Sequence, residues 1–121
     1  MSNDVVHFEI IGTDPAALRA YYSDLFGWRT DDADAAPEVS DRGSYGFVSG
    51  AGLAGGIGGG SSSTPHAVMY VGVDDVEMAL AKAESLGGTR VFGPALNPDG
   101  SVEVGQFRDP EGTLIGVAHP L

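Results

Sequence analysis

Hydrophobic and polar positions alternate along residues 5–11, VVHFEII. Side chains with a period of two lie on opposite faces of an extended chain, so this segment predicts a strand. One face is wholly apolar, whereas the other carries His7 and Glu9. That division is typical of a sheet with one side packed on a core and the other side open to solvent or a ligand.

A helical pattern follows directly. Asp14 is a favourable N-cap, Pro15 suits the first helical position, and Gly27 is a typical helix stop. Between them an apolar stripe with helical spacing predicts one amphipathic helix. Beyond it we expect extended chain at 28–30, a loop over 31–43, short strands at 44–50 and 52–59, and a flexible linker over 59–65.

The second half repeats this order. An alternating segment at 66–73 precedes Asp74 and Asp75, a second apolar helical stripe and the stop at Gly87 and Gly88. When the two halves are aligned with Asp14 on Asp75, strand falls on strand and helix on helix, and Leu25 falls on Leu86. The remaining strands are expected at 89–92, 101–107 and 113–118.

The repeat predicts two βαβββ modules in an α+β fold. We place the first module at about 4–59, the linker at 59–65 and the second module at about 66–119, all within a single domain spanning 1–121. Neither half could bury a strand face alone, so the two modules are expected to pair, within one chain or between chains.

The composition of the chain argues against several classes of binding partner and of chemistry. Six Lys and Arg residues stand against 17 Asp and Glu, a net charge of −11, which argues against nucleic acid and anionic membranes. There is no cysteine, so thiol catalysis and Cys-bound zinc are excluded. The first residues, MSNDVVHF, do not have the pattern of a signal peptide, and no apolar run is long enough to cross a bilayer. A cytoplasmic protein is expected.

Known catalytic motifs point to no specific reaction in this sequence. Gly50, Gly52 and Gly55 fit G-x-G-x-x-G, but no helix follows them, so a dinucleotide site is not expected. His7 is a candidate metal ligand or a hydrogen-bonded pocket histidine, and Glu9 points the same way. On the matching strand His66 and Tyr70 share a face. The alternative for His66 is an exposed residue at a strand end.

Three segments carry a family resemblance: VVHFEIIGTDPAALRAYYSDLFGW (5–28), VMYVGVDDVEMALAKAESLGG (68–88) and FRDPEGTLIGV (107–117). Together they resemble the vicinal oxygen chelate superfamily, which includes glyoxalase I, extradiol dioxygenases and bleomycin-resistance proteins. The resemblance covers almost the whole chain. It implies a curved, cup-shaped mixed sheet with helices on the outside and a small-molecule site in the cup.

In metal-dependent members each module supplies two metal ligands, and the resemblance maps these four positions onto this chain. The first falls on His7, seven residues before Asp14. The others fall on Val68, Gly116 and Gly55, none of which offers a donor side chain. The resemblance therefore implies that the standard metal centre is lost, and that glycine at two positions opens the floor of the cup to a larger organic ligand. Glyoxalase I activity is not expected.

We accordingly expect a glyoxalase-like or bleomycin-resistance-like homodimer that binds a small organic molecule without a cofactor. The alternative is an enzyme of this superfamily, a lyase, isomerase or dioxygenase, that uses His7 with Glu9 or His66, either on a divalent metal or with His7 as a metal-free base. The negative charge weakly favours a cationic ligand. The expected pocket residues are His7, Glu9, Gly55, His66, Val68, Tyr70 and Gly116.

Overall fold

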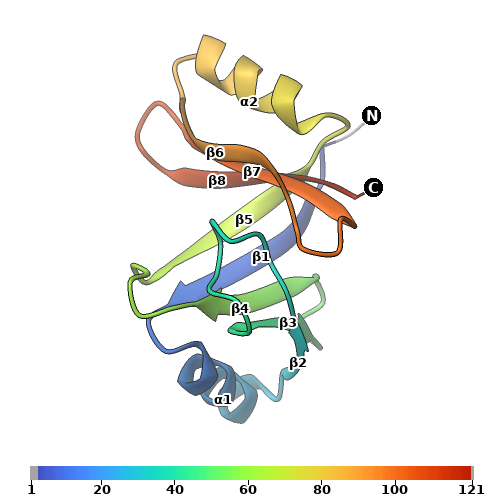
Figure 1. The fold of residues 1–121 in the computed structure, drawn as a ribbon, viewed down its shortest axis with the longest axis vertical. Helices are drawn as coiled ribbons and strands as arrows, with labels where there is room; N and C mark the ends of the chain where they lie inside the picture. The colour runs from blue at the N-terminus through green and yellow to red at the C-terminus, as the bar shows by residue number, and fades with distance from the viewer. Residues whose placement is uncertain (1–2, 121) are drawn as a thin grey trace. The chain divides into compact units, whose positions relative to one another are not determined.

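The computed structural model describes residues 3–120, which form two compact units. The first unit comprises residues 7–67, and the second comprises residues 3–6 together with 68–120. Strand β1 (Val5–Gly12) contributes its first two residues to the second unit and the others to the first. Each unit contains one helix and one group of four strands, so the predicted α+β class is confirmed (Figure 1).

The first unit follows β1 with helix α1 (Pro15–Phe26) and strands β2 (Arg29–Ala33), β3 (Tyr45–Ser49) and β4 (Gly55–Gly59). Strand β4 is antiparallel to β3 and parallel to β1, and β2 is antiparallel to β3. Helix α1 covers one face of this sheet (Figure 1). The Asp14 side chain caps the helix by accepting the Ala17 amide at 3.2 Å, as its sequence position predicts.

The second unit repeats the order with β5 (His66–Gly72), α2 (Val76–Ser85), β6 (Thr89–Leu96), β7 (Val102–Arg108) and β8 (Leu114–Pro120). Strand β8 is parallel to β5 and antiparallel to β7, which is antiparallel to β6. Asp75 caps α2 through the Met78 amide at 2.9 Å. Both units therefore have the predicted βαβββ order.

Three strand limits differ from the sequence prediction. Strand β2 continues to Ala33, into the segment expected to be a loop, because it pairs with β3 through Asp32 and Ala33. Strand β4 begins at Gly55 rather than at residue 52. Strand β6 runs on to Leu96, with register irregularities on either side of Phe92. Gly93 and Pro94 interrupt the alternation there, which is why the sequence pattern ended at residue 92.

A tight core joins α2 to its sheet. Val76 and Leu80 are fully buried and pack with Val117. A methyl group at Gly105 would lie 2.7 Å from a Leu80 methyl carbon, so glycine is what allows the helix to approach strand β7 this closely. Burial of such side chains is the main source of stability for the unit.

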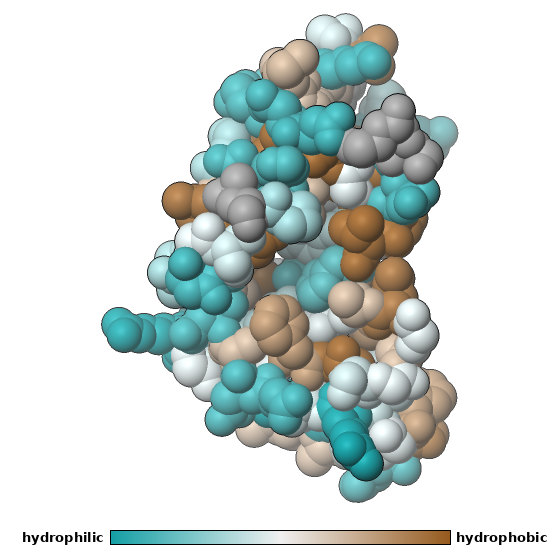
Figure 2. Space-filling view, turned by 90° about the vertical axis from the view of Figure 1, so that its right-hand side faces the viewer, coloured by the Kyte–Doolittle hydropathy of each residue, from teal (hydrophilic) through white to brown (hydrophobic). Residues whose placement is uncertain are grey.

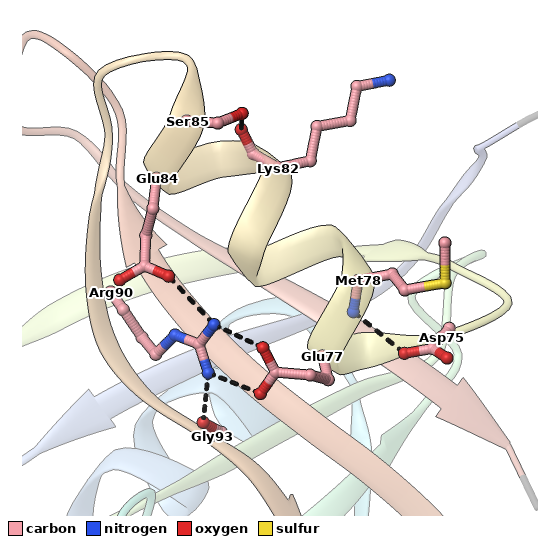
Figure 3. Close-up of polar contacts among 8 residues, drawn as sticks. All are labelled: Asp75, Glu77, Met78, Lys82, Glu84, Ser85, Arg90 and Gly93. Atoms are coloured by element: carbon pink, nitrogen blue, oxygen red, sulfur yellow. Dashed lines mark hydrogen bonds and ion pairs between the residues drawn. The ribbon is translucent and has the colours of Figure 1, made fainter.

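An arginine fastens the outer side of α2 to strand β6 (Figure 3). Arg90 donates two parallel hydrogen bonds to Glu77, at 2.8 and 2.7 Å, and one to Glu84 at 3.0 Å. It also donates to the Gly93 carbonyl at 3.2 Å. The hydrogen bonds from Arg90 to Glu77 lower the pKa of the Glu77 carboxyl group. Both glutamates of this helix face are thus already paired with one cation.

Many large hydrophobic side chains remain at the surface. On the face drawn in Figure 2 they form separate groups among hydrophilic residues. Within the described residues, no helix is long and apolar enough to span a membrane. The exposed set is Tyr21, Leu25, Phe26, Phe47 and Leu53 in the first unit, and Val5, Val6, Met69, Met78, Leu86, Val91 and Leu96 in the second.

Candidate functional site

The polar residues predicted on β1 lie on the sheet face that α1 leaves uncovered. Strand pairing sets Glu9 beside Gly56 of β4, and Phe47 of β3 beside the same glycine. Because alternate residues of a strand share a face, His7 and Tyr45 lie on this side too. Three strands of the first unit therefore bring His7, Glu9, Tyr45 and Phe47 together.

These side chains form a hydrogen-bonded chain. The Tyr45 hydroxyl donates to Glu9 Oε2 at 2.9 Å, and His7 Nε2 lies 3.0 Å from the Tyr45 oxygen. The Tyr45 hydroxyl therefore links the imidazole to the carboxyl group. The chain His7–Tyr45–Glu9 thus holds the imidazole in place.

Burial decides the charge of this imidazole. Glu9 and Tyr45 are 4% and 3% exposed, whereas the His7 side chain is 19% exposed. Desolvation lowers the pKa of His7 to about 4. His7 is therefore neutral at pH 7, and it is the most exposed member of the chain.

Aromatic rings border the chain. Phe47 meets the His7 ring edge-on at a centroid distance of 6.5 Å and the Tyr45 ring at 5.9 Å. Phe47 is half exposed, so it offers apolar surface directly beside the polar group. A neutral histidine next to an exposed ring is suited to holding a flat or apolar organic molecule by one hydrogen-bonding group.

The glycines of β4 differ in what they face. Gly55 lies on the face covered by α1, where an added methyl group would overlap the Phe8 ring. The glycine that shares a face with His7 and Glu9 is Gly56, and there an added methyl group would overlap the Tyr45 hydroxyl. Neither position is an open floor in this unit: the place of the missing side chain is taken by Phe8 at Gly55 and by Tyr45 at Gly56.

In the second unit, too, an aromatic side chain fills the space beside a glycine. Strand register sets Tyr70 beside Gly116, and a methyl group at Gly116 would overlap the Tyr70 ring. Gln106 donates to the Tyr70 hydroxyl at 2.8 Å. Val68 is buried with Tyr70 and Ala118 in one apolar cluster. The space expected from glycine at 116 is therefore filled by an aromatic ring, which corrects the expectation of an emptied floor.

His66 has a different environment from His7. It is exposed at the start of β5, and its Nδ1 lies 2.6 Å from the Thr64 carbonyl oxygen. It lines a groove beside α1 with Leu18 and Tyr22, rather than joining the His7–Tyr45–Glu9 chain. The exposed strand-end alternative describes this residue.

The described residues do not fit the metal centre that the family resemblance implies. They include no group of three or more His, Asp or Glu side chains that could hold a metal ion. At the other ligand positions that the resemblance assigns, Val68 belongs to an apolar cluster, the Phe8 ring covers Gly55 and the Tyr70 ring covers Gly116. One histidine remains, and a metal site needs more donors than one.

Sequence reasoning missed Tyr45 and Phe47, which complete the site, and Gln106, which binds Tyr70. A signal existed: in SYGFVSG the two aromatic residues alternate, so one strand face carries both. What the sequence did not supply was the pairing of β3 with β4, which brings that face to Gly56.

Comparison with protein families identifies one match over most of the chain. The model of the Glyoxalase/Bleomycin resistance protein/Dioxygenase superfamily matches residues 4–117. Among curated proteins no sequence matches.

Solved structures of similar fold cover nearly the whole chain. A hypothetical protein, BH1468, from Bacillus halodurans C-125 is 14% identical with a TM-score of 0.73, covering 100% of this chain and 96% of its own. A methylmalonyl-CoA epimerase variant from Streptomyces coelicolor in complex with 2-nitronate-propionyl-CoA is 15% identical with a TM-score of 0.70, covering 99% of each chain. The Mycobacterium tuberculosis methylmalonyl-CoA epimerase is 15% identical with a TM-score of 0.64, covering 97% and 87%. At these identities the likeness shows the fold alone.

Proposed function

The chain belongs to the Glyoxalase/Bleomycin resistance protein/Dioxygenase superfamily, and from that premise we propose that it binds a small organic molecule without the standard divalent metal. The observation that carries the proposal is the chain His7–Tyr45–Glu9 beside the half-exposed ring of Phe47. His7 supplies the hydrogen bond to the ligand, and Phe47 packs against its apolar part. Tyr45 and Glu9 hold the imidazole in place.

Charge favours one class of ligand. The chain carries −11 and a single lysine, so its long-range field repels anions and attracts cations. Glu9, buried beneath Tyr45, adds a carboxyl group close to the site. The proposed ligand is therefore a small aromatic or apolar amine. Val68, Tyr70 and Gly116 stay predicted pocket residues, and the homodimer stays a prediction.

Metal content tests the first half of the proposal. Protein purified without added metal is expected to carry well under one equivalent of zinc, nickel, manganese or iron by elemental analysis, because three of the four family positions offer no donor. The matched control is His119→Gln, which removes a histidine that bonds the Val73 carbonyl in the other unit. Near-stoichiometric metal that His7→Gln removes and His119→Gln retains would contradict the proposal.

Three fragments of equal shape test the ligand class. We expect 2-phenylethylamine to bind more tightly than 2-phenylethanol, and phenylacetate to bind least, in ligand-observed NMR titrations. His7→Gln and Phe47→Ala should each weaken amine binding, with His119→Gln unchanged. Equal binding of the three fragments, or an amine response that survives both substitutions, would refute the assigned site.

A second candidate is an isomerase in which His7 acts as a metal-free base. It is favoured by the hydrogen bond that holds the imidazole in place, since a base must be oriented toward the proton it removes. Several similar structures are methylmalonyl-CoA epimerases, so methylmalonyl-CoA in deuterated water is a direct probe. Binding without catalysis predicts no deuterium incorporation above background. Incorporation that His7→Gln abolishes would establish the enzyme instead.

A further inference from the structure

A groove of about 420 Å³ lies beside α2 in the second unit, on the helix-covered side of the sheet. Its walls come from the helix and from strands β5 and β8. They are mostly aliphatic, and the size falls in the range of small-molecule sites. Its lining residues include Val71, Ala79, Lys82, Ala83, Asp109 and Ile115.

Two small residues form the helix side of this groove. Ala79 and Ala83 lie one turn apart on the side of α2 that faces Val71 and Ile115. The alignment of the two halves places Leu18 and Tyr22 at the same points of α1. The wall that α2 contributes is therefore aliphatic and free of aromatic rings, which suits an apolar chain lying along the helix.

Lys82, the only lysine of the chain, lines the same groove. Its neighbours at three and four residues along the helix are Met78, Ala79, Ser85 and Leu86, none of them acidic. Arg90 already binds the two glutamates of α2, and Figure 3 shows Lys82 extending away from that cluster. No ion pair joins Lys82 to any residue that the structure describes.

The groove has one carboxylate, and it is engaged elsewhere. Asp109 Oδ1 accepts the backbone amides of Glu111 and Thr113, at 2.9 and 3.0 Å, which closes the turn before β8. Two backbone amides therefore hold one oxygen of this carboxylate in the turn. The ammonium of Lys82 is left as the group that can receive an anion.

We propose that this groove binds a small amphipathic carboxylate, with its apolar chain along Ala79 and Ala83 and its carboxylate on Lys82. The occupant follows from local charge complementarity: the mostly aliphatic groove includes Lys82, which forms no ion pair with the residues that the structure describes. The site lies in the second unit and shares no residue with the His7 site, so it goes beyond the proposed function.

The first unit provides an internal comparison. Its groove beside α1 is larger, about 600 Å³, but Tyr21 stands where the second unit has Lys82. Asp14 also lines that groove, and neither lysine nor arginine does. An anionic amphiphile is therefore expected in the second groove and not in the first.

Octanoate is the probe that tests this site, with 1-octanol and octylamine as matched ligands. We expect octanoate to bind with a Kd on the order of 1 mM, typical of a ligand of this size in an open groove. Backbone NMR signals of Ala79, Ala83 and Ile115 should shift, with those of Leu18 and Tyr22 unchanged. Octanol and octylamine should bind several-fold more weakly.

Three variants complete the test. Lys82→Met is expected to weaken octanoate binding about fivefold, the upper range for an exposed ion pair, whereas Lys82→Arg retains it. Ala83→Tyr places a ring where the apolar chain of the ligand is proposed to lie and should weaken octanoate binding. Unfolding curves check that each variant folds, and His7→Gln should leave octanoate binding intact, which separates this site from the proposed function.

Three results would overturn the proposal. The first is equal affinity for octanoate and octanol together with no effect of Lys82→Met. The second is octanoate shifts confined to the groove of the first unit. The third is no octanoate binding, with signals of Ala79 and Ala83 that depend on protein concentration, which would assign the groove to a second copy of the chain.

Discussion

Gly116→Glu, which installs the carboxylate that metal-dependent relatives carry at this position, is expected to lower the free energy of unfolding by about 3 kcal/mol or more. The new side chain would overlap the ring of Tyr70, which is 1% exposed and held by Gln106 at 2.8 Å. It would also bring a carboxylate to the apolar cluster of Val68 and Ala118. Urea unfolding measures the loss, and elemental analysis should find no metal gained.

The matched control adds the same group outside the core. Thr113 is exposed three residues earlier, so Thr113→Glu should change stability by less than about 0.5 kcal/mol. Gly116→Ala should cost about 1–3 kcal/mol, since it causes the overlap without the charge. The prediction would be contradicted by a Gly116→Glu protein that is as stable as the wild type and binds one zinc ion per chain. The Tyr70 ring would then have moved to admit the carboxylate.

Acidification should destabilise the protein through His7. Its pKa falls from 6.5 to about 4 on folding, so between these values the unfolded chain binds a proton that the folded chain does not. The stabilising effect of a neutral His7 is fully present above pH 6.5 and is lost as the pH falls toward 4. A shift of this size corresponds to about 3 kcal/mol.

A pair of proteins isolates this contribution. Stability of the wild type and of His7→Gln is measured by urea unfolding from pH 7.5 to 4, and the difference between the two curves is compared. The two proteins share every other titratable group, so those contributions cancel in the difference. The variant is expected to lose about 3 kcal/mol less than the wild type over this range. Parallel curves would mean that His7 binds a proton equally well in the folded and unfolded chains.

Local patterns predicted most of the fold. Helix α1 lies between Asp14 and Gly27, as the capping residues indicated, and each half has its predicted order of elements. The same alternation placed His7 and Glu9 on one face, which the structure confirms. These features depend on neighbouring residues alone, and the sequence contains that information directly.

The position of Gly55 shows the limit of transferring residues from one repeat to the other. The alignment of Asp14 with Asp75 relates Glu9 to Tyr70 and Gly55 to Gly116, whereas the strand registers make Gly56 the counterpart of Gly116. A slip of one residue turns a side chain to the opposite face of a sheet, so Gly55 lies against Phe8 under α1. Internal repeats transfer positions reliably only up to the first loop of unequal length.

The prediction of an open pocket floor at Gly55 and Gly116 was wrong for a different reason. A glycine in the sequence reports a missing side chain but not what occupies the space. Here the occupants are Tyr45, from a strand paired at long range with β4, and Tyr70, from the strand beside Gly116. Dense packing makes some neighbour fill such space, and only the register identifies which one.

The glycine and tyrosine pairs also constrain how this chain can change by mutation. In each unit a carboxylate cannot enter at Gly56 or Gly116 until Tyr45 or Tyr70 has become smaller. A smaller residue at either tyrosine leaves a cavity until the glycine has been replaced. Every single-step route to the ligand set of the metal-dependent relatives therefore passes through a less stable protein. Each glycine and its tyrosine would have to change together. We therefore expect both pairs to persist through random mutation.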